Sequence, residues 1–275
     1  MRAQMRVPFI KMHGLGNDFV ILDGREQELP VLPTRVIAAL ADRRTGIGCD
    51  QLVRLEPSSA AGTDFRMRIF NADGGEVGAC GNASRAVALL HGRPARIETE
   101  SGIVSALPLK SGVEVDMGVP RFEWDSVPLA YPMDTLAMPV AWDMLENPAA
   151  VSVGNPHVVF FVDRQEDIPL KQLGPEIEND QLFPERINVN VATVTDRDSI
   201  CLRVWERGSG LTRACGTGAC ATAVSAIRRR LVDNEVTVHL PGGALQISWD
   251  GSGSIIMSGP AQESFRGEFD LQDYL

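Results

Sequence analysis

Residues 69–82 read IFNADGGEVGACGN, and residues 204–217 read VWERGSGLTRACGT. Both stretches end in Cys-Gly followed by a polar residue. They are offset by about 135 positions, much more than the roughly 20–50 residues of a solenoid repeat. The offset therefore indicates duplicated domains rather than a repeat array.

Four further pairs of segments occur at nearly the same offset and in the same order. GNDFV at 16–20 matches GNPHV at 154–158, DQLV at 50–53 matches INVN at 187–190, RMRI at 66–69 matches CLRV at 201–204, and MGVP at 117–120 matches MSGP at 257–260. Five matches in register are hard to attribute to composition. The first predicted half is residues 1–124, to which the tail 264–275 returns, and the second is residues 125–263.

Each half is predicted to contain short strands and a helix that begins after its cysteine. Strand-sized runs lie at 19–22, 65–70, 97–100, 113–117, 158–162, 190–194, 200–205, 235–240 and 245–249. Helical runs lie at 34–43, with Thr34 as N-cap, at 82–90 and at 218–230, and Pro241-Gly242-Gly243 predicts a tight hairpin. The predicted fold class is mixed α and β (α+β): two pseudo-symmetric duplicated domains, each a mostly antiparallel, barrel-like sheet around a central helix, with the active site in the cleft between them.

Composition and charge exclude several classes of function. The chain has 275 residues, 44% hydrophobic and 23% charged, which is typical of a globular protein with a substantial core. Its formal net charge of −10 argues against a nucleic acid or an anionic membrane as partner. Because there is no signal-peptide h-region and no run of about 18 apolar residues, we expect a cytoplasmic protein with its cysteines as thiols. No C-x-x-C pair suggests structural zinc, and no metal site is expected.

Cys80 and Cys215 each stand between a strand–loop and the start of a predicted helix. Unsatisfied N–H groups and the positive end of the helix dipole make such a place an anion site, and the same field is expected to lower the pKa of the thiol. Two such units facing each other would put a sulfur on each side of a bound carbon. That is the arrangement of a two-base racemase, in which one thiolate removes an α-proton and the other thiol delivers a proton to the opposite face.

Structural interpretations of the same residues stay open. Free cysteine is among the most buried residue types, so Cys80 and Cys215 could be core thiols, as Cys49, Cys201 and Cys220 are expected to be. The asparagines of the motif loops could be turn residues, which asparagine favours. The equivalent positions of two cysteines in a duplicated chain favour the catalytic interpretation for that pair.

The motifs together resemble those of the diaminopimelate epimerase family, from about Phe9 to Phe265. They are KMHGLGNDF at 11–19, FNADG at 70–74, CGN at 80–82, GNPH at 154–157, ERIN at 185–188, WERG at 205–208 and ACGTGAC at 214–220. The resemblance implies interconversion of LL- and meso-2,6-diaminopimelate, on the bacterial route to lysine and peptidoglycan, with no cofactor such as pyridoxal phosphate and no metal. A small-molecule substrate is then the expected partner, and a homodimer is the expected assembly.

By motif position, the resemblance also implies a set of site residues. Cys80 and Cys215 would be the acid/base pair, with the pKa values of their thiols tuned by His157 and Glu206. The reacting carboxylate would be bound by backbone N–H groups of Gly81, Asn82, Gly216 and Thr217. The remaining amino and carboxylate groups would be held by Asn17, Gln51, Asn71, Asn155, Asn188, Glu206 and Arg207. An arginine suits the distant carboxylate because its guanidinium grips carboxylates bidentately.

The chain departs from the family pattern beside the first cysteine. Gly78-Ala79 stands where an acidic residue and Met are usual, and Ala83-Ser84 where Gly-Ala is usual. These changes affect loop rigidity and rate rather than a proposed ligand.

Three other functions stay open. A proline-racemase-like enzyme shares the two-cysteine design but carries His where this chain has Asn82, and it lacks the Glu206-Arg207 pair. A thiol-redox protein would not need the asparagines. A non-catalytic amino-acid binder would show no exchange of the α-hydrogen.

Overall fold

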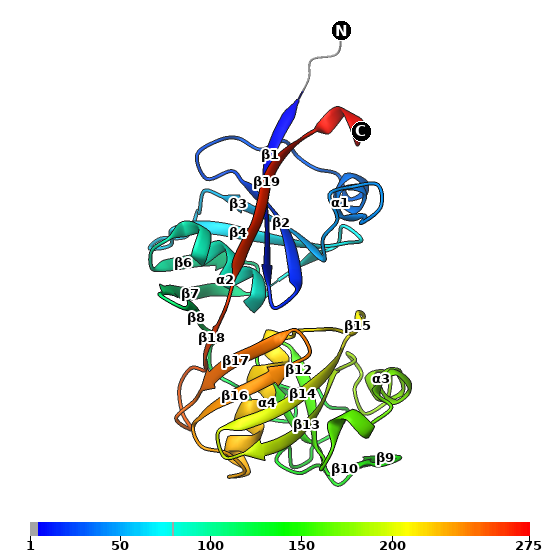
Figure 1. Ribbon diagram of the computed structural model, residues 1–275. Helices are drawn as coiled ribbons and strands as arrows, with labels where there is room; N and C mark the ends of the chain where they lie inside the picture. The colour runs from blue at the N-terminus through cyan, green and yellow to red at the C-terminus, as the bar shows by residue number, and fades with distance from the viewer. Residues whose placement is uncertain (1–4, 79) are drawn as a thin grey trace. The chain divides into compact units, whose positions relative to one another are not determined.

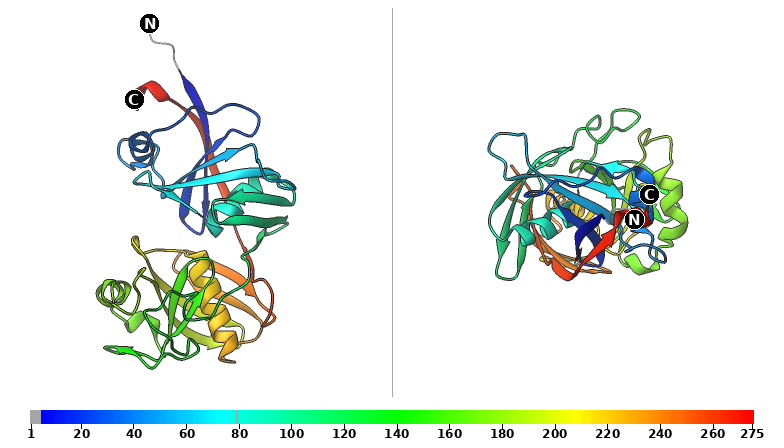
Figure 2. Two further views of the ribbon diagram at one scale, coloured as in Figure 1. Left: turned by 180° about the vertical axis from the view of Figure 1, so that it is seen from behind. Right: turned by 90° about the horizontal axis from the view of Figure 1, so that it is seen from above.

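The computed structural model describes residues 5–78 and 80–275, and the chain divides into two compact units (Figure 1). The first unit comprises the chain up to Val115 together with Pro260–Leu275, and the second comprises Asp116–Gly259. The chain therefore passes between the units twice, and the C-terminal segment belongs to the first unit. Figure 2 shows both units from two further directions.

The first unit is built mostly from antiparallel strands. Its elements are β1 (Arg6–Gly14), β2 (Asn17–Asp23), α1 (Thr34–Ala41), β3 (Gln51–Glu56), β4 (Phe65–Asn71), β5 (Glu76–Val77), α2 (Gly81–His91), β6 (Ala95–Thr99), β7 (Gly102–Leu109), β8 (Gly112–Asp116), β19 (Gln262–Asp270) and the 3-10 helix η2 (Leu271–Asp273). Strand β1 pairs antiparallel with both β2 and β19, and β3–β4, β4–β5, β6–β7 and β7–β8 are antiparallel too. The parallel pairs are β2–β3 and β4–β6.

The second unit repeats this plan. Its elements are β9 (Ala141–Trp142), β10 (Leu145–Glu146), β11 (Ala149–Ser152), β12 (Pro156–Phe161), the 3-10 helix η1 (Gln165–Asp167), α3 (Leu170–Glu178), β13 (Asn188–Asp196), β14 (Ser199–Glu206), β15 (Gly210–Leu211), α4 (Gly216–Arg228), β16 (Glu235–Leu240), β17 (Gly243–Ser248) and β18 (Ile256–Gly259). The parallel pairs are β12–β13 and β14–β16, and the other strand pairs are antiparallel.

The registers of the two units match. In the parallel pair of the first unit Phe19 lies opposite Gln51, and in the second unit His157 lies opposite Asn188. These are the residues that the sequence repeat makes equivalent. The same holds one strand further on, where β4 pairs with β5 as β14 pairs with β15. The duplication predicted from the sequence is therefore reproduced in the strand pairing.

A largely buried helix lies at the centre of each unit. Eleven of the 13 residues of α4 are buried, and α4 contacts β11, β12, β13, β14, β16 and β17 (Figures 1 and 2). Its sequence, GTGACATAVSAIR, is dominated by small residues, which let the strands approach its backbone closely. In the same way α2 contacts β1, β6, β7 and β19. The predicted fold class is confirmed: duplicated halves of mostly antiparallel strands around a central helix.

Most predicted elements are present, with two corrections. Thr34 is not the N-cap of α1: Pro33 occupies that position, and no side chain caps the helix. Cys201 is half-buried on β14 rather than part of the core, whereas Cys49 and Cys220 are buried. The hairpin is confirmed, since Leu240 pairs with Gly243 around a two-residue turn. None of the helices in the described ranges is long and apolar enough to cross a membrane.

Candidate active site

Each motif cysteine is the N-cap of the central helix of its unit. The Cys80 sulfur accepts a hydrogen bond from the N–H of Ala83 at 3.5 Å, and the Cys215 sulfur accepts one from the N–H of Gly218 at 3.3 Å. A capping group of this kind satisfies one N–H of the first turn, and the others have no partner within the helix. Both sulfurs therefore lie beside a cluster of backbone donors that suits an anion.

In the first unit, Asn17 and Asn82 lie next to Cys80. The side-chain N–H of Asn82 donates to Asn17 Oδ1 at 3.0 Å, and the Cys80 sulfur lies 3.9 Å from the same oxygen. Two charged residues fix both amides, because Arg85 Nη2 donates to Asn82 Oδ1 at 2.7 Å and Asn17 Nδ2 donates to Asp50 Oδ2 at 3.0 Å. Asn17 thus presents its oxygen to the Cys80 thiol.

In the second unit, Asn155 occupies the position equivalent to Asn17 but turns the other way. His157 Nε2 lies 3.0 Å from Asn155 Oδ1, and Asn155 Nδ2 donates to Thr217 Oγ1 at 3.3 Å. Thr217 Oγ1 is 3.5 Å from the Cys215 sulfur. His157 thus reaches Cys215 through two intermediate side chains.

Cys215 and Glu206 form a thiol–carboxylate pair. Burial raises the pKa of the Cys215 thiol well above its ordinary value, and the charge of Glu206, with its hydrogen bond to the thiol, adds to the shift. Hydrogen bonds from Thr217 and the N–H of Gly218 act in the opposite direction and do not outweigh it. The expected lowering of the pKa by the helix N-terminus is therefore wrong for this cysteine, because desolvation of a side chain only 4% exposed dominates.

His157 is neutral in this environment. It is fully buried on β12, and this burial lowers its pKa to about 3. The charge of Arg207 lowers the pKa further. His157 can therefore act on the sulfur as a hydrogen-bonding group but not as a nearby positive charge.

The other predicted substrate ligands form one group in each unit. In the first unit, Gln51 Nε2 donates to Asn71 Oδ1 at 3.0 Å, and the oxygen of Gln51 is buried with no partner among the described residues. In the second, Asn188 Oδ1 accepts from the N–H of Arg207 at 2.9 Å, and the Arg207 guanidinium donates to the carbonyl of Glu185 at 2.8 Å. Asn188 thus holds the end of β14, where Arg207 follows Glu206.

The sequence departures beside Cys80 make local contacts where the structure describes them. A Cβ on Gly78 would lie 2.2 Å from Ser101 Oγ, so a larger residue at this position would require the Ser101 side chain to move. Ser84 Oγ donates to the Cys80 carbonyl at 3.1 Å, which keeps the serine within the first turn of α2. Ala79 lies outside the described residues.

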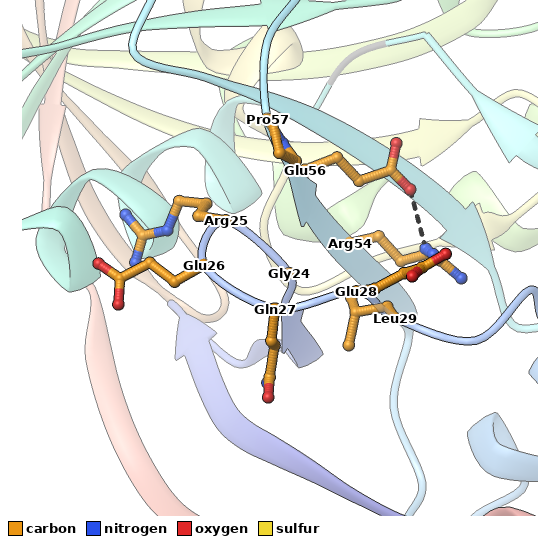
Figure 3. Close-up of a pocket in the computed structure, with 9 residues that line it drawn as sticks. All are labelled: Gly24, Arg25, Glu26, Gln27, Glu28, Leu29, Arg54, Glu56 and Pro57. Atoms are coloured by element: carbon orange, nitrogen blue, oxygen red, sulfur yellow. Dashed lines mark hydrogen bonds and ion pairs between the residues drawn. The ribbon is translucent and has the colours of Figure 1, made fainter.

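Two other features do not add to the site. A pocket of about 550 Å³ in the first unit is lined by Gly24, Arg25, Glu26, Gln27, Glu28, Leu29, Arg54, Glu56 and Pro57 (Figure 3). It contains none of the predicted site residues, and Arg54 is occupied by Glu56 Oε1 at 3.1 Å and the Pro30 carbonyl at 2.7 Å. Across residues 5–78 and 80–275, His, Cys, Asp and Glu form no group of three that could hold a metal ion.

Sequence reasoning missed three residues that hold the site together: Asp50, Arg85 and Asn190. Asp50 and Arg85 act on Asn17 and Asn82 from other elements, and this proximity is a tertiary property. Asn190 could have been found from the sequence, because it lies two positions after Asn188 on the same strand and therefore on the same face. A polar residue on that face within an apolar run indicates a specific hydrogen-bonding role.

Known proteins resemble this chain over most of its length. The model of the family described as diaminopimelate epimerase matches residues 9–123 and 149–263. A protein of Erythrobacter litoralis (strain HTCC2594) named diaminopimelate epimerase is 65% identical over 270 residues, covering 98% of this chain and 100% of that protein. Two solved structures share the fold at low identity: a phenazine biosynthesis protein of the PhzF family from Enterococcus faecalis (TM-score 0.70, 14% identity, 96% and 99% of the two chains) and a hydroxyproline epimerase from Agrobacterium vitis (0.68, 13%, 98% and 94%). The chain belongs to the diaminopimelate epimerase family.

Proposed function

We propose that this chain interconverts LL- and meso-2,6-diaminopimelate by a two-base reaction between Cys80 and Cys215. The observation that carries the proposal is the presence, in each duplicated half, of a cysteine at the N-cap of the central helix. The halves are proposed to be residues 1–124 with 264–275, and residues 125–263, which contribute one thiol each. Both thiols would then act on one substrate.

The carboxylate next to the reacting carbon is proposed to bind at both helix N-termini. The backbone N–H groups of Gly81, Asn82, Gly216 and Thr217 belong to the first turns of α2 and α4. Such groups carry partial positive charge and are already oriented before the substrate arrives. When the α-proton leaves, negative charge develops on this carboxylate, so these donors stabilise the transition state more than the bound substrate.

Glu206 accounts for the thiolate that the reaction needs. It accepts the proton of the Cys215 thiol, leaving a thiolate and a neutral carboxylic acid. The thiolate removes the α-proton, and Cys80 gives its thiol proton to the opposite face of the carbon. The reverse direction starts from the Cys80 thiolate that remains. The two cysteines supply both proton transfers, so the proposal requires no pyridoxal phosphate or metal.

The distal end of the substrate is proposed to meet Arg207 and the side chains around it. Arg207 follows β14, and the Glu185 carbonyl and Asn188 hold it in place. The buried oxygen of Gln51, which has no donor among the described residues, suits an ammonium group. Asn71, which accepts a hydrogen bond from Gln51, and Asn155, which lies beside His157 and Thr217, are proposed as further polar groups of the substrate site.

Exchange of the α-hydrogen tests the proposal. The protein is incubated with LL-diaminopimelate in deuterated water, and the α-proton signal and the ratio of isomers are followed by NMR. We expect deuterium to enter at the α-carbon together with formation of the meso isomer, and alanine and lysine to be very poor substrates because the distal polar groups would be left unpaired. Binding without exchange would show a non-catalytic binder, and comparable turnover of proline would indicate a proline racemase.

Arg207→Lys is expected to raise KM by about 10- to 100-fold with a smaller change in kcat, because lysine lacks the planar fork that matches a carboxylate. Steady-state kinetics of epimerisation measure the two constants separately. Arg186→Lys is the matched control, since the Arg186 guanidinium pairs with Glu178 at 3.4 Å and has no proposed substrate contact. An unchanged KM in Arg207→Lys would remove this residue from the substrate site.

The redox alternative receives less support from the structure. A thiol sensor needs an accessible thiol with a low pKa, whereas Cys215 is buried with a raised pKa. We further propose that the protein acts in the cytoplasm as a homodimer. Size-exclusion chromatography with light scattering tests the dimer.

A further inference from the structure

We propose that Asn190 is a positioning residue that sets the tautomer of His157 and thereby directs a hydrogen-bond donor at the Cys215 sulfur. The proposal rests on the proposed function of Cys215. Asn190 lies on β13 and is fully buried. Its Nδ2 donates to the Val158 carbonyl at 3.0 Å and lies 3.0 Å from His157 Nδ1.

The Val158 carbonyl fixes which way the Asn190 amide points. A carbonyl only accepts hydrogen bonds, so the NH₂ group of Asn190 must face it, and its second hydrogen then reaches His157 Nδ1. Nδ1 is therefore the acceptor of the ring. His157 is neutral, and a neutral imidazole has one N–H, so the proton is on Nε2.

That tautomer also determines which group donates in each of the remaining hydrogen bonds. His157 Nε2–H donates to Asn155 Oδ1, which turns Asn155 Nδ2 toward Thr217 Oγ1. The Thr217 oxygen accepts that bond and keeps its own hydrogen for the Cys215 sulfur. Four side chains thus bring a donor to the thiolate without adding a net charge to the site.

Charged groups at the end of β14 act on this series of hydrogen bonds. Glu206, at the end of β14, raises the pKa of Cys215, and Arg207 acts on His157 from the same strand end. A donor from Thr217 opposes the effect of Glu206 and makes the thiolate accessible during turnover. Without Asn190 either ring nitrogen of His157 could carry the proton. The hydrogen bonds that lead from His157 to Cys215 would then no longer have a fixed direction.

The surroundings of Asn190 also indicate that this position requires the NH₂ group of the side chain rather than its oxygen. Its Oδ1 is buried without a partner among the described residues, which an apolar residue at this position would avoid. This oxygen packs against the first turn of α4, where a Cβ on Gly218 would lie 2.8 Å from it. In the first half, Val53 is equivalent to Asn190 and Phe19 is equivalent to His157. Neither side chain can form these hydrogen bonds, so the arrangement occurs beside Cys215 and is not repeated by the equivalent residues of the first half.

Asn190→Asp and Asn190→Leu test the proposal, with Thr222→Val as the matched control. Thr222 is also fully buried in the second unit, and its hydroxyl has no partner among the described residues. Both Asn190 variants are expected to lower kcat/KM at neutral pH by about 10- to 100-fold, the effect of losing one hydrogen bond to a charged group. Thr222→Val is expected to leave it unchanged.

Two readouts separate positioning from a loss of structure or of the proposed function. The first is the tautomer of His157 in protein with ¹⁵N-labelled histidine: we expect Nε2–H in the parent protein and Nδ1–H in Asn190→Asp. The second is the pH dependence of Cys215 alkylation by iodoacetamide, located by mass spectrometry, which is expected to move to higher pH in both variants. Neither readout requires epimerase activity.

An Nδ1–H tautomer in the parent protein would overturn the proposal, even if Asn190→Leu failed to fold. Unchanged kcat/KM and alkylation profiles in a folded Asn190→Leu would overturn it as well.

Discussion

Replacing Cys215 with alanine is expected to lower kcat by about 10³-fold or more, and Cys80→Ala is expected to do the same. In a two-base reaction each face of the α-carbon has one proton-transfer partner. Removing either sulfur leaves one of the two proton transfers without its acid or base. The two losses are expected to be non-additive, since the cysteines act as a unit.

Epimerisation assays by NMR, with Cys201→Ala as control, measure this effect. Cys201 is a half-buried free thiol on β14 of the second unit, so its loss tests for a general need for cysteine. We expect near-normal kcat in Cys201→Ala. Full activity in Cys215→Ala would end the two-base proposal, and loss of activity in Cys201→Ala with retained folding would show that a different thiol is required.

The repeated segments made the fold class predictable, but breaker residues and edge strands hid several elements. Helix α3 contains Gly174 and Pro175, which read as a turn, yet it forms because its apolar face packs in the core with Leu170, Leu173 and Ile177. Strand β19 is exposed over most of its length and has little apolar periodicity. It forms because it pairs with β1, which lies near the other end of the sequence. Tertiary contacts overrode local preference in both cases.

The candidate site shows the same limit for electrostatics. The sequence places Cys215 at a helix N-terminus, and that feature alone predicts a low pKa. It does not show that the thiol is buried, nor that a carboxylate nine positions earlier in the chain returns to contact it. The direction of the Asn17 amide is equally invisible in the sequence, because it depends on Asp50, which comes from a different strand end.

Glu206→Gln is expected to lower kcat/KM at neutral pH by about 10²-fold, because glutamine cannot accept the Cys215 proton. The pKa of the Cys215 thiol is expected to fall at the same time. The Glu206 carboxylate raises that pKa by its charge and by accepting the thiol hydrogen. Glutamine removes the charge and offers an N–H to the thiolate, so the thiolate forms at lower pH in the variant.

The pH profile of Cys215 alkylation, measured by mass spectrometry beside the epimerisation rate, distinguishes this outcome from unfolding. Partial unfolding would also expose Cys220, which is fully buried in the same helix and serves as an internal reporter. We expect the Cys215 profile to shift to lower pH while Cys220 stays unreactive. A profile that stays in place, with activity retained, would mean that Glu206 neither holds nor accepts the Cys215 proton, and the thiolate would then have to come from another group beside α4.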